Sequence, residues 1–137
     1  MPSVFEVART VVAEEIDGLG HVNNLVYLRW LQDAAVEHSA IEGWDAAAYR
    51  RIGRAWVARS HFIEYLAPAR VGDRVLVRTW VTGMKRATST RRYEVFCADD
   101  SLKLIRAETH WAFIALETHR PARIPEEVRD SFVVVAD

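Results

Sequence analysis

One long helix followed by four turn-separated strands constrains the fold of this chain more than any other feature. From Asn24 to Ile41 the apolar residues recur at steps of three and four, which predicts a helix with one buried stripe. A short second helix is expected at 45–51. Alternation with a period of two then predicts strands at 55–65, 74–82, 88–98 and 102–116, with an earlier strand at 4–12. This order indicates an α+β fold, in which an antiparallel sheet wraps around one central helix.

Length and composition predict one domain, residues 1–137. Half of the residues are hydrophobic, so a packed core is available. The net charge is −1, from 18 basic and 19 acidic residues, which provides no general attraction to nucleic acid or to a membrane surface. A single cysteine, Cys97, excludes an internal disulfide, and no run is long enough for a membrane span. We therefore expect a soluble cytoplasmic protein without nucleic-acid or membrane partners.

The loop Asp17–Asn24, with the sequence DGLGHVNN, is the strongest candidate for a chemical site. It places a carboxylate, Asp17, seven positions ahead of Asn24, at the mouth of the apolar helix. The unpaired N–H groups of a helix N-terminus can polarise a carbonyl oxygen while a carboxylate acts on the carbonyl carbon or on water. On position alone, the Asp-Gly pair more often marks an ordinary turn.

The same loop, followed by Tyr27 and Trp30, resembles the signature of hotdog-fold thioesterases. The resemblance is closest to the 4-hydroxybenzoyl-CoA thioesterase-like and acyl-ACP thioesterase-like groups. Further matching words follow in family order, namely YLAPARVGD at 65–73, VRTW at 77–80, ETHWAF at 108–113 and RPARIP at 120–125. Together they span nearly the whole chain. The resemblance implies the hotdog fold and the hydrolysis of an acyl thioester to a free acid and a thiol, without a metal or cofactor.

The resemblance also implies roles for individual residues. Asp17 matches the catalytic carboxylate of the 4-hydroxybenzoyl-CoA group, and the backbone N–H of Asn24 matches the group that polarises the thioester carbonyl. Asp17 could attack the carbonyl directly or activate water, and the sequence does not separate these routes. His21 is a third catalytic candidate with a supporting role, either orienting substrate or holding the loop. Asn23, a possible helix cap, and Tyr27 are predicted to contact substrate.

Substrate and assembly are also predicted. The expected substrate is an acyl-CoA, with an acyl carrier protein thioester or a non-catalytic acyl-CoA-binding role as alternatives. Basic and hydroxyl residues near the turn between the third and fourth strands are candidates for binding the phosphates of CoA: Lys85, Arg86, Ser89, Arg91 and Arg92. The alternative is a solvated edge whose arginines block strand pairing. A homodimer or homotetramer is expected, with active sites near the subunit interface.

One histidine is expected in the core, and three aromatic residues are candidates for an acyl pocket. His38 lies on the apolar stripe of the helix and is interpreted as a core histidine. Trp56, Phe62 and Tyr65 are aromatic residues that could line an acyl pocket.

Overall fold

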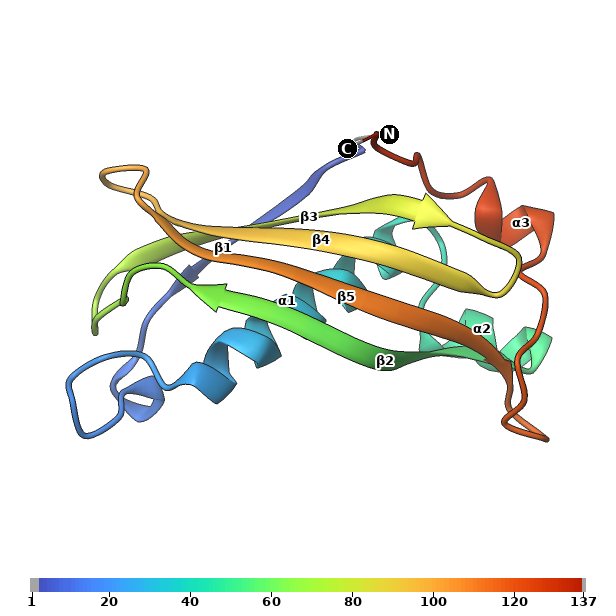
Figure 1. Cartoon of the computed structure of the whole chain (residues 1–137), viewed down its shortest axis with the longest axis horizontal. Coiled ribbons are helices and arrows are strands. Elements are labelled where there is room, and N and C mark those ends of the chain that lie inside the picture. Colours follow the sequence, from blue (N-terminus) through green and yellow to red (C-terminus); the bar gives the residue numbers. More distant parts are fainter. Residues whose placement is uncertain (1–2, 137) are drawn as a thin grey trace.

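One antiparallel sheet and one long helix dominate the structure, a computed structural model that describes residues 3–136 (Figure 1). The elements in chain order are β1 (Phe5–Thr10), the 3₁₀ turn η1 (Ala13–Glu15), α1 (Asn24–Ile41), α2 (Ala46–Ile52), β2 (Arg54–Tyr65), β3 (Arg74–Met84), β4 (Thr88–Cys97), β5 (Lys103–Ala115) and α3 (Glu126–Arg129). The sheet has the order β1-β3-β4-β5-β2, and every neighbouring pair is antiparallel. The predicted α+β arrangement is confirmed.

Local sequence signals set the ends of α1. The side chain of Asn23 caps the helix, because its Oδ1 accepts a hydrogen bond from the N–H of Leu25 at 2.9 Å. The helix ends at Ile41, and Gly43 follows with a φ of +96°, a conformation that favours glycine. One stripe of the helix is buried, formed by Tyr27, Trp30, Leu31, Ala34, Ala35 and His38.

The inner faces of the central strands show the predicted alternation. In β3 the buried residues are Val75, Val77, Thr79 and Val81. In β4 they are Ser89, Arg91, Tyr93 and Val95. Because successive side chains of a strand point to opposite faces, each set shares one side of the sheet. Val77 pairs with Val95, and Val95 pairs with Ile105 of β5, so the three strands present one continuous apolar surface to α1.

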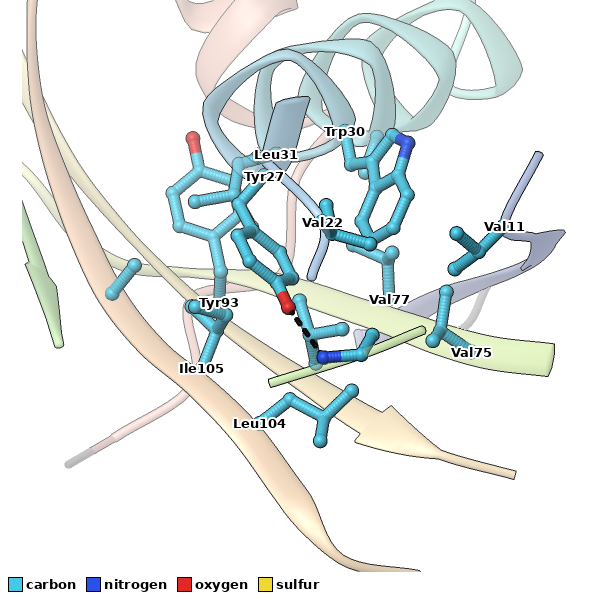
Figure 2. Packing of buried hydrophobic residues seen from close by; sticks show 14 of the residues in the cluster. Val11, Val22, Tyr27, Trp30, Leu31, Val75, Val77, Tyr93, Leu104 and Ile105 are labelled. Atoms are coloured by element: carbon cyan, nitrogen blue, oxygen red, sulfur yellow. Dashed lines mark hydrogen bonds between the residues drawn. The ribbon is translucent and has the colours of Figure 1, made fainter. Parts of the chain in front are cut away.

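Tyr27 anchors α1 to the connection between β2 and β3 (Figure 2). Its ring packs edge-on against Trp30 at 5.3 Å between centroids, and its hydroxyl accepts a hydrogen bond from the N–H of Ala69 at 3.0 Å. The carbonyl of Ala69 accepts a hydrogen bond from Val22 N–H at 2.9 Å. The N–H and the carbonyl of Ala69 are therefore both hydrogen-bonded, one to the first turns of α1 and the other to the loop before it.

The two ends of the molecule carry different features (Figure 1). The loop between β1 and α1 lies at one end of the molecule, together with the β2–β3 connection and the turn between β4 and β5. The β3–β4 hairpin, α2 and α3 lie at the other end. The 18 residues of α1 separate these ends by about 27 Å, at about 1.5 Å per residue. None of the described helices is long and apolar enough to cross a membrane.

Replacing Tyr27 with Phe should lower the free energy of unfolding by about 1–3 kcal/mol, because the buried N–H of Ala69 loses its acceptor. Denaturant titration followed by tryptophan fluorescence measures the change. Tyr65→Phe is the matched control, since Tyr65 is 46% exposed, and should change stability by less than about 0.5 kcal/mol. Equal effects of the two substitutions would contradict the role given to the Tyr27 hydroxyl.

Candidate active site

The carboxylate of Asp17 is fixed by the backbone of its own loop. Its Oδ1 accepts hydrogen bonds from the N–H groups of Leu19 at 2.8 Å and His21 at 3.3 Å. The N–H of Asp17 in turn donates to the carbonyl of His21 at 2.8 Å, and Gly20 adopts a φ of +78° within the turn. Both side-chain hydrogen bonds use Oδ1, which leaves Oδ2 without a partner among the described residues. The half-buried carboxylate therefore has a defined orientation and one oxygen available to a ligand.

The loop leads directly into the N-terminus of α1. Asn23 caps the helix, and its N–H donates to the carbonyl of Glu15 at 2.9 Å. Asn24 is the first helical residue, so its N–H has no acceptor within the helix. The partial positive charge of the helix N-terminus lies at the same place. An orphan N–H and an oriented carboxylate thus flank one short loop, as the sequence predicted.

The side chains of His21 and Tyr27 lie in different surroundings, since His21 is half-buried and Tyr27 is fully buried. The backbone of His21 holds the turn, whereas its half-buried imidazole makes no hydrogen bond to the described residues. Tyr27 is 2% exposed, and its hydroxyl is already bonded to the N–H of Ala69. The structure therefore places Tyr27 in the core, apart from the exposed part of the loop where a substrate contact was predicted.

The predicted cluster of phosphate-binding residues does not form one surface. Lys85 and Arg86 are exposed in the hairpin between β3 and β4. Ser89 and Arg91 are buried on the inner face of β4, with exposed fractions of 8% and 6%, so they are not available to a phosphate at the surface. Arg92 points to the other face and pairs with Glu108 of β5. The alternation along β4 that puts Val95 and Tyr93 on the inner face of the sheet also puts Arg91, two residues before Tyr93, on that face. This alternation is the sequence signal for the burial of Arg91.

A cavity of about 330 Å³ lies between the C-terminal half of α1, α2 and the sheet. Its aromatic walls are formed by Trp44, Tyr49, Trp56, Trp111 and Phe132. Three arginines, Arg50, Arg54 and Arg91, also line it, and no carboxylate side chain of the described residues does. Of the three aromatic residues predicted for an acyl pocket, Trp56 lines this cavity, whereas Phe62 and Tyr65 are exposed elsewhere on β2.

Arg91 belongs to a buried polar cluster beside the cavity. Its Nη1 donates to His38 Nδ1 at 2.9 Å and to Thr79 Oγ1 at 3.1 Å. Because Nδ1 accepts, His38 carries its proton on Nε2, which faces Glu42 Oε1 at 3.8 Å. Burial and the charge of Arg91 lower the pKa of His38 to about 4, so this core histidine is neutral at neutral pH.

The chain matches the family described as the thioesterase-like superfamily over residues 11–132. The chain belongs to this superfamily. It is a thioester hydrolase with the hotdog fold, as the sequence predicted. Among residues 3–136, no group of three His, Cys, Asp or Glu side chains is placed to hold a metal ion.

Named relatives show the same relationship. The chain is 27% identical to the chloroplastic acyl-acyl carrier protein thioesterase ATL3 of Arabidopsis thaliana, over 97% of this chain and 70% of that protein. It is 30% identical to a 1,4-dihydroxy-2-naphthoyl-CoA hydrolase of Synechocystis, over 89% of each chain. The crystal structure of a 1,4-dihydroxy-2-naphthoyl-CoA thioesterase from Synechocystis matches with a TM-score of 0.86 at 27% identity, over 93% of this chain and 94% of that one.

The lowered pKa of His38 makes stability depend on pH. The unfolded chain binds a proton at His38 below about pH 6.5, whereas the folded chain binds it only near pH 4. The stabilising effect is therefore complete above pH 6.5 and is lost as the pH falls towards 4, by up to about 3 kcal/mol.

His38→Asn removes the titrating group and keeps an acceptor for Arg91, so its unfolding free energy should fall less steeply over this pH range. The exposed His119→Asn is the control and should follow the wild type. Parallel pH profiles for the wild type and His38→Asn, measured by denaturant titration, would contradict the prediction.

Proposed function

We propose that this thioesterase hydrolyses acyl-CoA, with Asp17 as the catalytic carboxylate and the N–H of Asn24 as the group that polarises the carbonyl. The observation that supports this most directly is the fixed orientation of Asp17 beside the start of α1, with Oδ2 left for the reaction. A thioester is electrophilic and its thiolate leaves readily, so one carboxylate and one oriented dipole are sufficient.

The reaction follows from the placement of these groups. The thioester carbonyl oxygen accepts a hydrogen bond from the Asn24 N–H, and the helix N-terminus stabilises the negative charge that develops on that oxygen. Asp17 either takes a proton from an attacking water or attacks the carbonyl carbon itself to give an anhydride that water then opens. In both routes the C–S bond breaks, and the products are a carboxylic acid and a thiol. His21 serves the reaction by closing the loop through its backbone.

The choice of CoA over a carrier protein rests on the hairpin between β3 and β4. Lys85 and Arg86 are exposed there and can bind the phosphates of CoA. Hydrolysis of an acyl carrier protein thioester is the alternative, since the Arabidopsis relative is named for that substrate. The cytoplasmic location expected from the sequence stays a prediction.

Asp17→Asn should abolish turnover and preserve the fold, because an amide oxygen still accepts the loop N–H groups but neither attacks nor takes a proton at neutral pH. We expect kcat to fall at least about a hundredfold. The assay is thiol release from aryl, short-chain and long-chain acyl-CoAs. Asp99→Asn, in the exposed β4–β5 turn, is the charge-matched control and should retain wild-type rates.

A folded Asp17→Asn protein with more than roughly a tenth of wild-type activity would remove Asp17 from the central role. If the wild type hydrolyses none of the acyl-CoAs, the same assay with acyl carrier protein thioesters decides between the alternative substrate and a binding role.

The active unit that we propose is a homodimer formed through β2. This strand has 12 residues, lies at the edge of the sheet and pairs with β5 on one side only. Six consecutive residues, 57–62, are exposed. A long exposed edge with unpaired backbone groups readily pairs with another strand. In a twofold dimer the two copies of the same edge run antiparallel, which extends the sheet across both subunits.

This antiparallel pairing brings the opposite ends of two molecules together. Tyr65 ends β2 beside the loop, and its hydroxyl lies 3.5 Å from the carbonyl of Asn24. Arg54 begins β2 beside the cavity that it lines. Pairing therefore places the Asp17 loop of one copy near the cavity and the β3–β4 hairpin of the other. Within one chain these features lie at opposite ends of α1, so the dimer explains how one substrate reaches all of them.

Replacing Val57 and Phe62 together with Glu should convert the dimer to a monomer, because four carboxylates would face one another across the paired edges. Sedimentation velocity and light scattering measure the mass. Leu102→Glu with Val133→Glu is the matched control, since both are exposed apolar residues outside β2. A wild-type monomer at micromolar concentration would contradict the dimer.

A further inference from the structure

We infer that the cavity binds acyl groups whose far end carries a carboxylate, and that Arg91 is the residue that selects them. The inference rests on the proposed thioesterase function and on the dimer, in which the cavity of one copy faces the Asp17 loop of the other. It names the substrate class: a thioester of a dicarboxylic acid, with one carboxyl as the thioester and the other free.

The wall of the cavity carries a buried positive charge on Arg91. Arg91 is 6% exposed and keeps its positive charge, because a guanidinium is not deprotonated in a protein. No carboxylate of the described residues lies within ion-pair distance of Arg91 or lines the cavity. Glu42, the one acid among the described buried residues, lies on the far side of the His38 ring. A buried charge without a direct partner is costly, and an anionic ligand group would offset this cost.

The guanidinium of Arg91 has a fixed orientation with unused donors. Both hydrogen bonds of Arg91 to the described residues use Nη1, with His38 and Thr79 as acceptors. Nε and Nη2 of Arg91 have no acceptor among the described residues, and the side chain lines the cavity. His38 is neutral and Thr79 is fully buried, so they fix the guanidinium without neutralising it. The remaining N–H groups are donors for the two oxygens of a carboxylate.

Several other polar groups of the cavity already have partners, whereas Trp111 Nε1 is a buried donor without a hydrogen-bond partner among the described residues. The hydroxyl of Tyr49 accepts from Trp56 Nε1 at 3.0 Å and shares a hydrogen bond with Ser39 at 2.9 Å. Ser89 donates to the carbonyl of Gly83 at 2.9 Å. An anionic group that enters between the aromatic walls therefore finds unused donors on Arg91 and at Trp111 Nε1, whereas an apolar end would leave the charge of Arg91 without a partner.

The experiment compares acyl-CoA pairs that differ only in a terminal carboxylate or methyl group. One pair is suberyl-CoA and octanoyl-CoA, and the other is 4-carboxybenzoyl-CoA and 4-methylbenzoyl-CoA. We expect wild-type kcat/KM to favour the carboxylate member of at least one pair by about tenfold or more, as a charge-assisted hydrogen bond predicts. Arg91→Met should reverse the preference, and Arg91→Lys, which keeps the charge, should restore part of it.

The control is Arg51→Met, which removes an exposed arginine of α2 that does not line the cavity and should leave the preference unchanged. Wild-type preference for the methyl member of both pairs overturns the inference while the thioesterase function stands, and this result needs no variant. An unchanged preference in folded Arg91→Met also overturns it. If the wild type hydrolyses no thioester at all, the proposed function itself fails and the inference fails with it.

Discussion

The packing of one stripe of α1 against the inner face of β3, β4 and β5 determines where every functional group lies. Tyr27, Trp30 and Leu31 fix the N-terminal half of the helix, and with it the position of the Asn24 N–H. His38 fixes the C-terminal half against Arg91. Because protein interiors are close-packed, the helix cannot slide along the sheet without breaking both sets of contacts. The Asp17 loop at one end of the molecule and the cavity at the other are therefore held at a constant separation.

The sequence predicted most of the fold because its patterns are local. Period-two alternation identified β3 and β4, and the cap at Asn23 with the glycine at Gly43 marked the limits of α1. The placement of Asp17 next to the helix start was also visible, since its hydrogen bonds join residues at most four positions apart. These features need no knowledge of distant contacts.

The burial and hydrogen-bond partners of Arg91 were not visible for the opposite reason. Arginine is almost never fully buried, so the charge suggested a surface cluster with Lys85 and Arg86. Its partners, His38 and Thr79, lie 53 and 12 positions away, and no local pattern reports such pairs. The same limit applies to Tyr27, whose hydroxyl is used by Ala69 across 42 positions. Alternation indicates which residues of a strand share a face, whereas the bonding partners of a buried side chain depend on the tertiary structure.

In the proposed mechanism the carboxylate of Asp17 has two tasks, divided between its two oxygens. Oδ1 holds the loop, and Oδ2, which has no partner among the described residues, is the oxygen that we propose reacts. An asparagine would keep the loop and lose the reactive oxygen, whereas a glutamate would keep the charge but extend the side chain by one methylene and misplace both oxygens. Neither asparagine nor glutamate at position 17 would therefore perform both of these proposed tasks. One side chain therefore links the shape of this loop to the proposed reaction, so a change that disrupts the hydrogen bonds of Oδ1 would also displace the oxygen that we propose reacts.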